Sequence, residues 1–363
     1  MNPIDNKEAS MKYFTDQNEI KFFRTPAEFN KYTEQSTLKY AIGANMYMPA
    51  TQKNVYEKLI HNKFGGLGAI TLCMEDAISE QMLPEAQENV LGILRMLHEN
   101  KPSGANLPLI FIRVRNPLQF SCFAEKLEKD HLAELCGFNF PKFNSLNGNQ
   151  YFETLKRLSG NSGEILYGMP IIEDENVMFK ETRFVELAKI QKILMRYPEH
   201  VLNIRVGGTD FSSIYGLRRS ADTTIYDIKV VGDCLKDIIN FFLRQDCGYV
   251  ISGPVWEYFS WDGDSKEIRG LERELELDIQ NGFMGKTIIH PSQIDTVNRK
   301  YIVSYDDYMD AMAILESDGG VFRSFSGRRM NETLPHMNWA RKIVAKSEIF
   351  GVLENADADV KNS

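Results

Sequence analysis

Two short apolar runs that each lead to an acidic residue are the parts of this sequence best suited to chemistry. The first covers residues 165–172 and ends at Glu173, and the second covers residues 202–206 and leads to Asp210. Each run has the length and composition of a buried parallel strand. An acid at the carboxyl end of such a strand lies where α/β folds carry their reactive groups. Two acids about one βα unit apart predict a sparse carboxylate site suited to Mg²⁺, which takes one or two carboxylates and keeps several waters.

These two acids also have a structural interpretation. Either acid could cap the helix that follows its strand, or could pair with Arg205, Arg218 or Arg219 nearby in the sequence. A metal ion, a helix N-terminus or an arginine would each offset the cost of burying a carboxylate. The pattern by itself therefore leaves both interpretations open.

A second group of charged residues follows two other apolar runs. Glu75 and Asp76 end the run that begins at residue 69, and Arg113 and Arg115 lie in the run 107–115. Positions two apart in a strand point to the same face, so both arginines are candidates for substrate contact. The structural alternatives are a salt bridge from Arg113 to the acid pair and a helix N-terminal role for the acids. A salt bridge would still be compatible with substrate binding by Arg113.

Composition narrows the class of protein. The chain has 363 residues, of which 43% are hydrophobic and 25% charged, as in soluble globular proteins. A net charge of −8 argues against general nucleic-acid binding. Five widely spaced cysteines without a CxxC pair favour a reduced, cytoplasmic protein with neither a disulfide framework nor a zinc site. The N-terminus lacks an apolar signal core, and no run of about 18 apolar residues predicts a membrane span.

Strand-like and helix-like segments alternate along the chain, and a Ser/Gly-rich loop is expected at 159–163. Eight strands alternating with helices over about 250 residues predict a (β/α)₈ TIM barrel. A doubly wound open sheet alternates in the same way, but no strand is followed by GxGxxG, which weakens that alternative. The predicted strands are 38–49, 69–76, 107–115, 137–142, 165–173, 202–210, 249–255 and 285–291. The predicted helices are 54–63, 86–99, 118–135, 184–197, 228–244 and 268–281.

Three parts of the chain are expected from these elements. Residues 1–36 are polar and predict an N-terminal arm that docks through Phe22 and Phe23. Residues 37–300 form the predicted barrel, and residues 301–363 a helical C-terminal extension. The extension is too short for an enzyme domain, so we expect it to pack on the barrel or on a neighbouring subunit.

Two basic motifs invite a phosphate-binding interpretation. Gly285-Lys286-Thr287 resembles the end of a P-loop, but Gln280 stands where that motif needs a glycine, so a nucleotide site is not expected. Arg218 and Arg219 follow the strand that leads to Asp210 and could hold a phosphate or carboxylate, or be a solvated salt-bridge pair.

Six short motifs occur in an order that carries a family resemblance. The set resembles the citrate lyase β-subunit and HpcH/HpaI aldolase superfamily over about residues 38–345. It is most similar to the long branch of TIM-barrel carbon–carbon bond lyases encoded near tellurite-resistance genes. The motifs are Met74-Glu-Asp-Ala-Ile78, Ile112-Arg-Val114, Pro141-Lys142, Pro170-Ile-Ile-Glu173, Gly208-Thr-Asp-Phe211 and Gly285-Lys-Thr-Ile-Ile-His-Pro-Ser-Gln-Ile294.

The resemblance implies a role for each matching residue of the site. Glu173 and Asp210 match the Mg²⁺ ligands of the family. Arg113 matches the arginine that holds a carboxylate or carbonyl oxygen of the substrate. Glu75 and Asp76 match the acid pair that orders the waters of the metal and the arginine.

The resemblance also implies residues around this centre. Lys142, Gly208 and Thr209 fall in matching motifs and, with Arg115 and Arg218, are expected to contact substrate; Lys142 and Lys286 match family lysines of less clear role. In several members of the family that the chain resembles, a C-terminal Met-Ile-Asp segment reaches the site of a neighbouring subunit and offers a catalytic acid. Here the segment reads Met330-Asn331-Glu332, with Glu in place of Asp. We therefore expect a homo-oligomer, a trimer or a dimer of trimers, in which Glu332 is a candidate acid.

These observations together predict a Mg²⁺-dependent carbon–carbon bond lyase or aldolase. Its substrate would be a 2-oxo acid, an acyl-CoA thioester or a phosphorylated compound that reacts through a metal-stabilised enolate. Arg113, Glu75, Asp76 and Glu332 would be its catalytic residues. One alternative is a non-catalytic metal-binding barrel that serves as a binding or assembly module in a stress-response system. Another is an enzyme of phosphoenolpyruvate or pyruvate, for which the sequence offers no phosphohistidine or nucleotide motif.

Overall fold

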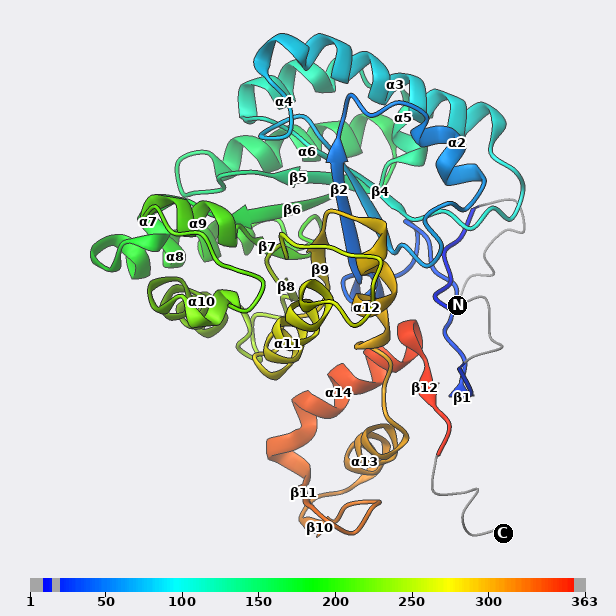
Figure 1. Cartoon of the computed structure of the whole chain (residues 1–363), viewed down its shortest axis with the longest axis vertical. Helices are drawn as coiled ribbons and strands as arrows, with labels where there is room; N and C mark the ends of the chain where they lie inside the picture. The colour runs from blue at the N-terminus through cyan, green and yellow to red at the C-terminus, as the bar shows by residue number, and fades with distance from the viewer. Residues whose placement is uncertain (1–8, 15–19, 356–363) are drawn as a thin grey trace.

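Eight parallel strands surround a common axis in the computed structural model, which describes residues 9–14 and 20–355 (Figure 1). Their order around the sheet is β8-β7-β6-β5-β4-β3-β2-β9. A parallel bridge between Gly253 and Lys286 joins the two ends of this order and closes the ring. The predicted (β/α)₈ barrel is confirmed. The strands are β2 (Ala44–Pro49), β3 (Ala69–Cys73), β4 (Leu109–Arg113), β5 (Gly137–Phe140), β6 (Tyr167–Ile172), β7 (Ile204–Val206), β8 (Ile251–Ser252) and β9 (Lys286–Ile288).

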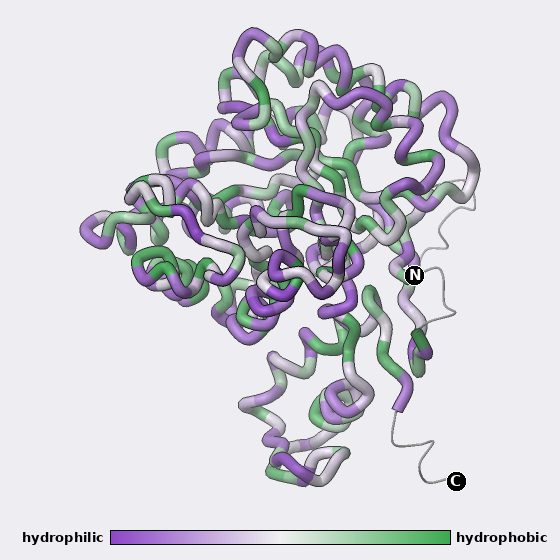
Figure 2. Tube along the Cα trace, in the orientation of Figure 1, coloured by the Kyte–Doolittle hydropathy of each residue, from purple (hydrophilic) through white to green (hydrophobic). Residues whose placement is uncertain are grey.

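Helices cover the outside of this ring, so apolar strand residues are buried on both faces. All five residues of β4 are buried, for example, and its last residue, Arg113, faces the barrel interior. Hydrophilic and hydrophobic stretches alternate along the outer helices, as expected for helices with one face on a sheet (Figure 2). The α-helices are α1 (Gln35–Leu38), α2 (Val55–Ile60), α3 (Leu83–Asn100), α4 (Pro117–Ala124), α5 (Lys129–Glu134), α6 (Gly148–Ser162), α7 (Glu175–Met178), α8 (Lys180–Leu194), α9 (Gly208–Ile214), α10 (Lys229–Phe242), α11 (Lys266–Gln280) and α12 (Ile294–Arg299). Short 3₁₀ turns cover Glu80–Met82, Ile225–Asp227 and Pro291–Gln293.

Two of the predicted helical assignments are wrong. The single helix expected over 118–135 is two helices, because Glu128 and His131 form a capping box that starts α5 afresh after α4 ends. The Ser/Gly-rich segment 159–163 is not a loop throughout: residues up to Ser162 continue α6, which Gly163 ends with a φ of +75°. Tertiary burial of the apolar side of α6 outweighs its weak local propensity.

The N-terminal arm contacts the C-terminal end of the described chain. Strand β1 (Phe22–Arg24) pairs antiparallel with β12 (Val352–Leu353). The buried ring of Tyr13 stacks on Phe350 at 4.5 Å, and its hydroxyl donates to the carbonyl oxygen of Ala41. Phe23 is 54% exposed and meets the edge of Tyr305. Tyr13, which the sequence pattern did not single out, is therefore a more deeply buried anchor than Phe23. The arm's residues 1–8 and 15–19 lie outside the described part.

The C-terminal extension contains two long helices and a small hairpin. Helices α13 (Tyr305–Glu316) and α14 (Thr333–Phe350) share a small core of Ala311, Ile314 and Ala340. Strands β10 (Val321–Arg323) and β11 (Met330–Glu332) form an antiparallel hairpin between them. Figure 1 shows this unit on the side of the barrel from which β2 enters, away from the end to which the β2 arrow points. No helix among the described residues combines the length and apolar character needed to cross a bilayer.

Candidate active site

Four carboxylates and one guanidinium meet at the carboxyl ends of the barrel strands, after β3, β4, β6 and β7. Arg113 is the last residue of β4, and Cys73, the last residue of β3, is its register partner. The Nη2 atom of Arg113 lies 2.7 Å from Oε2 of Glu75, 3.4 Å from Oδ2 of Asp76 and 3.2 Å from Oε1 of Glu173. A single guanidinium nitrogen thus holds three carboxylates in one place. We call Glu75, Asp76, Glu173 and Asp210 the acid cluster.

Lys142 connects the fourth carboxylate to the other three. Its Nζ lies 2.7 Å from Oε1 of Glu75, 3.5 Å from Oδ2 of Asp76 and 3.5 Å from Oδ1 of Asp210. Its backbone N–H donates to Oε1 of Glu173 at 2.8 Å. Lys142 has a φ of +48°, a region that non-glycine residues rarely occupy. This backbone conformation lets one residue place both its amide and its ammonium on the acid cluster.

Glu173 sits against a glycine that follows β7. A Cβ built on Gly207 would lie 2.1 Å from Oε2 of Glu173, so a residue with a side chain cannot occupy this position without displacing the carboxylate. Strand β7 ends at Val206, and Asp210 stands in the first turn of α9 rather than at a strand end. The chain therefore turns directly over Glu173 before it presents Asp210.

The acid cluster carries more negative than positive charge. Its four carboxylates face the two cations Arg113 and Lys142, which leaves a formal charge of −2 when all six groups are ionised. Burial, opposed by Arg113 and reinforced by the charge of Asp210, raises the pKa of Glu173 to about 7. Burial likewise raises the pKa of Glu75. Despite partial burial, the pKa of Asp76 is lowered by its hydrogen bond with Glu75 and by Arg113.

The donor set fits a hard divalent cation. Mg²⁺ is bound by one or two carboxylates with several waters, and the surplus charge of −2 is what one such ion would balance. The ammonium of Lys142 already occupies a cation position among three carboxylates. Among the described residues, no group of three or more His, Cys, Asp or Glu side chains forms an all-protein metal cage. Such a cage is characteristic of structural zinc sites and is not required for Mg²⁺.

The other residues predicted to bind substrate form no hydrogen bond or ion pair with the carboxylates of the acid cluster within the described residues. Arg115 donates from Nε to the carbonyl oxygen of Met74 and from Nη2 to that of Ile78, so it braces the segment that carries the acid pair. Gly208 is buried in α9, whereas Thr209 and Arg218 are exposed. Of these four residues, only Arg115 forms side-chain hydrogen bonds with the backbone beside the acid cluster, within the part of the chain that the structure describes.

Arg219 and Lys286 belong to a separate buried ion network between the barrel and α11. Nζ of Lys286 lies 2.9 Å from Glu274 and 2.6 Å from Asp278, and all three side chains are fully buried. Arg219 pairs with Glu274 as well. Of the two adjacent arginines, Arg219 therefore has a structural role, whereas Arg218 is exposed.

Glu332 lies far from the acid cluster of its own chain. It ends β11 in the C-terminal extension, on the opposite side of the barrel from the end to which β2 points (Figure 1). Its backbone N–H donates to Nδ1 of His336, and within the described residues it forms no hydrogen bond or ion pair with the acid cluster.

The barrel interior contains polar residues that sequence reasoning did not assign to the site. Oη of Tyr47, from β2, accepts a hydrogen bond from Nδ2 of Asn139, from β5, at 2.5 Å. Arg205, from β7, is 1% exposed, and its Nη2 donates to Oγ1 of Thr287 at 2.5 Å. We call Tyr47, Asn139, Arg205 and Thr287 the polar floor. Their signal was a polar side chain inside a predicted buried strand.

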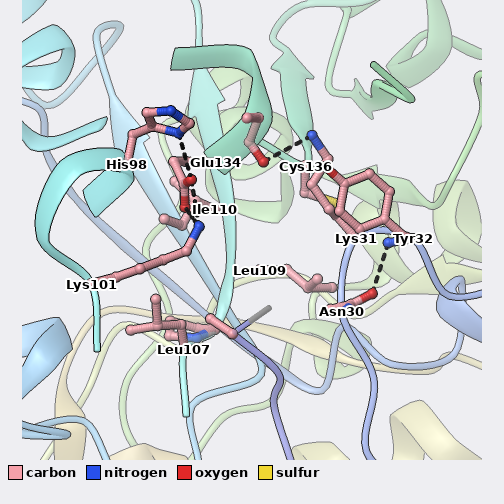
Figure 3. Close-up of a pocket in the computed structure, with 13 residues that line it drawn as sticks. Asn30, Lys31, Tyr32, His98, Lys101, Leu107, Leu109, Ile110, Glu134 and Cys136 are labelled. Atoms are coloured by element: carbon pink, nitrogen blue, oxygen red, sulfur yellow. Dashed lines mark hydrogen bonds and ion pairs between the residues drawn. The ribbon is translucent and has the colours of Figure 1, made fainter. Parts of the chain in front are cut away.

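A concave pocket elsewhere on the surface has no comparable chemistry (Figure 3). It lies at the amino ends of β4 and β5, where Leu109 and Cys136 contribute to its wall. Its lysines are neutralised: Lys31 pairs with Glu164 and Lys101 with Glu134. The charges of this pocket are therefore used within the protein, which leaves the acid cluster as the candidate active site.

Comparison with known proteins gives one family and several related folds. The family model described as carbon–carbon bond lyase of the TIM-barrel fold matches residues 36–352. No curated protein matches the sequence. A citrate lyase structure from Burkholderia xenovorans LB400 is similar over 88% of this chain and 95% of that chain, with a TM-score of 0.64 and 14% identity.

A second structure is the CitE protein of Mycobacterium tuberculosis in complex with magnesium, acetoacetate and coenzyme A. It is similar over 85% of this chain and 99% of that chain, with a TM-score of 0.55 and 19% identity. At these identities the likeness establishes the fold.

Proposed function

The chain belongs to the family of carbon–carbon bond lyases of the TIM-barrel fold, and on that premise we propose that it is a Mg²⁺-dependent lyase or aldolase acting on a 2-oxo acid or an acyl thioester. The observation that carries this proposal is the acid cluster. Three carboxylates converge on one guanidinium nitrogen, and the cluster keeps a surplus charge of −2. Mg²⁺ would balance this surplus negative charge and would chelate the anionic substrate.

Each residue of the centre has a part in this proposal. Glu173 and Asp210 would hold the metal, which when bound supplies Lewis-acid polarisation of the substrate carbonyl. Arg113 supplies a fixed positive charge 3.2 Å from Glu173, in position to bind a carboxylate or the developing enolate oxygen. Glu75, whose pKa burial raises, is the proposed proton carrier. The backbone N–H of Asp76 donates to Oε2 of Glu75 at 2.9 Å and orients it.

The similar Mycobacterium tuberculosis structure supports the choice of cofactor and substrate class. That protein is in complex with magnesium, with the 3-oxo acid acetoacetate and with coenzyme A. For this chain we extend the proposal to a 2-oxo acid, with a coenzyme A thioester or a phosphorylated compound as a second substrate. Exposed Thr209 and Arg218, on and after α9, are proposed contacts for that second substrate.

The position of Glu332 bears on assembly. Because the extension that carries Glu332 lies away from the barrel end to which β2 points, we propose that Glu332 acts at the site of another copy. We therefore propose a homo-oligomer in the cytoplasm, in which this acid is contributed by a neighbouring subunit.

Calorimetry and proton exchange test the function directly. Mg²⁺ should bind the metal-free protein, and pyruvate should bind only when Mg²⁺ is present. In deuterated water the methyl protons of pyruvate should then exchange, followed by proton NMR, because enolate formation is the step that the site stabilises. Glu173→Gln and Asp210→Asn should each abolish Mg²⁺ binding while the folded state persists.

A matched control separates these effects from a general change of charge. Glu181→Gln removes one carboxylate from the exposed side of α8 and should leave both Mg²⁺ binding and exchange intact. A well-folded wild type that binds neither Mg²⁺ nor pyruvate would overturn the proposal and favour a binding or assembly module.

A further inference from the structure

Two donors hold the hydroxyl oxygen of Tyr47 inside the barrel. Nδ2 of Asn139 donates to it at 2.5 Å, and the side chain of Arg205 forms a second hydrogen bond with it. A guanidinium group and an amide nitrogen can only donate, so the Tyr47 oxygen accepts both bonds. A hydroxyl has two acceptor positions and one proton to donate. Within residues 9–14 and 20–355, Tyr47 forms no hydrogen bond as a donor, so its O–H is the part left for a ligand.

This O–H lies beside the acid cluster. The Tyr47 side chain extends from β2 to Asn139 of β5, and Asn139 is the register partner of Arg113, which holds the acid cluster. Tyr47 is partly exposed, whereas Arg205 is 1% exposed. Because Arg205 and Asn139 occupy the acceptor positions of the oxygen, a substrate in the candidate active site is the acceptor that its O–H can reach.

The buried charge of Arg205 has no acidic partner among the described residues. Its hydrogen bonds go to two neutral hydroxyl groups, those of Tyr47 and Thr287. Arg183, another buried arginine, pairs instead with two aspartates. A buried cation without an anion is costly, and of the two hydroxyl groups only the phenol ionises readily. The anion that matches Arg205 within this protein is therefore a phenolate of Tyr47.

Four ionisable groups act on the Tyr47 hydroxyl. Burial has the largest effect and raises the pKa of Tyr47 above its ordinary value, whereas the charges of two arginines lower it. The hydroxyl therefore keeps its proton at neutral pH, while its ionised form would be stabilised by two guanidinium charges. A protonated group with a stabilised conjugate base is suited to donate a proton. The four groups are Arg205 of β7, Arg113 of β4, Cys73 of β3 and Glu173 after β6.

We propose that Tyr47 is a catalytic acid that delivers a proton to the enolate carbon of the substrate, and that Arg205 is a positioning residue for the phenolate. The electron pair of the enolate double bond forms the new C–H bond. The electrons of the O–H bond stay on the tyrosine oxygen as a negative charge beside Arg205, and water later returns the proton. The inference rests on the proposed function and separates two proton transfers. Glu75 would accept the proton of the substrate hydroxyl when the carbon–carbon bond breaks.

Proton exchange of pyruvate tests the step in reverse, because the phenolate would then remove a methyl proton. With Mg²⁺ in deuterated water, the exchange rate should rise about tenfold between about pH 8 and about pH 9, as the phenolate fraction does. This range lies above the pKa of Glu173, which is about 7, so the charge of that carboxylate stays constant. Tyr47→Phe should lower the rate at least about a hundredfold. Calorimetry should show that it still binds Mg²⁺ and pyruvate.

Fluorine NMR of the metal-free protein follows the hydroxyl itself. Tyr47→difluorotyrosine, with fluorine on both carbons beside the hydroxyl, places a more acidic phenol at this position. Adding Arg205→Met should raise the pKa of this phenol by at least about one unit, because the phenolate loses its buried cation. Tyr47→difluorotyrosine alone should move the pH profile of pyruvate exchange downward. An unchanged phenol pKa in the double variant would overturn the role of Arg205.

Two control variants match these substitutions. Tyr13→Phe removes another buried hydroxyl, but that O–H is already donated to the carbonyl oxygen of Ala41 at 2.8 Å, so pyruvate exchange should persist. Arg244→Met removes an exposed guanidinium that lies 5.6 Å from the ring of Phe241. It should leave the pKa of the fluorinated phenol unchanged.

The results separate failure of this inference from failure of the proposed function. If the wild type does not bind pyruvate with Mg²⁺, or binds it without exchange, the proposed function is wrong and the inference falls with it. If the wild type exchanges and Tyr47→Phe exchanges equally fast, the proton belongs to Glu75 or Glu332. The inference is then overturned while the function stands. Tyr47→Phe and Tyr47→difluorotyrosine carry the test if Arg205→Met does not fold.

Discussion

The ammonium nitrogen of Lys142 lies 2.7 Å from Oε1 of Glu75 and 3.5 Å from Oδ1 of Asp210. Lys142 therefore connects buried Glu75 with the more exposed Asp210. Despite the opposing effect of burial, its hydrogen bond with Glu75 raises the pKa of Lys142. The protein thus carries its own monovalent cation at the place where we propose that Mg²⁺ binds.

This arrangement predicts competition between Lys142 and the metal. Lys142→Met removes one positive charge from the cluster, so the affinity for Mg²⁺ should rise about fivefold, which corresponds to about 1 kcal/mol for a half-exposed ion pair. Calorimetry at low salt would measure the change, and added salt should reduce it. Weaker Mg²⁺ binding in Lys142→Met would show that the lysine supports the metal site instead of competing with it.

The close approach of Gly207 to Glu173 predicts that even a methyl group is not tolerated there. In Gly207→Ala the new Cβ would lie 2.1 Å from Oε2 of Glu173, so the carboxylate must move. We expect Mg²⁺ binding to be lost and the free energy of unfolding to fall by about 1–3 kcal/mol. Mg²⁺ titration and urea unfolding of the same sample measure both effects.

Gly160→Ala is the control for that substitution. Gly160 is exposed in α6 with nothing within 4 Å of a built Cβ. An alanine there should increase the free energy of unfolding by about 0.5–1 kcal/mol and leave Mg²⁺ affinity unchanged. Equal behaviour of the two alanine variants would disprove the steric argument for Gly207.

The buried ion network predicts a purely structural role for Lys286. Lys286→Met leaves Asp278 buried without its cation, while Glu274 keeps only Arg219, so the free energy of unfolding should fall by about 3–5 kcal/mol. Urea unfolding measures this loss. The Mg²⁺ affinity of the folded variant should equal that of the wild type, and a loss of affinity with intact stability would place Lys286 in the active site instead.

The stability that Lys286→Met loses should increase with pH. Burial raises the pKa of Asp278, and removal of Lys286 raises it further. A carboxyl whose pKa is higher in the folded than in the unfolded state contributes a stability that is present below the unfolded pKa and is lost as pH rises. The stability deficit of Lys286→Met relative to wild type should therefore be larger at about pH 8 than at about pH 5. A constant deficit would contradict this assignment.

The barrel was predictable because each strand carries its own signal. Apolar runs such as 107–115 and 165–173 are recognisable from composition, and the β4 and β6 strands lie within them. The acids and Arg113 were found because they follow such runs, and the fold brings Glu75, Asp76 and Glu173 to one guanidinium nitrogen. The roles of these residues were implied by the family resemblance and stay a prediction.

Errors arose where one segment had two favourable local states. The break between α4 and α5 depends on the capping interaction of Glu128 with His131, which competes with a continuous helical pattern. The end of α6 was taken for a loop because serine and glycine disfavour helix locally, yet its apolar side is held against the barrel. A local capping interaction decided the first case, and tertiary burial decided the second.

The sequence by itself determined the barrel and placed its acids near the ends of predicted strands, because strand periodicity and strand-end position are properties of nearby residues. Only the tertiary structure decided which charges meet. It assigned Lys142 to the acid cluster, Arg219 to a structural network and Arg205 to the interior beneath Tyr47. The physical reason is that a charge has its effect through neighbours within a few ångströms, and closure of the barrel brings together residues far apart in the chain.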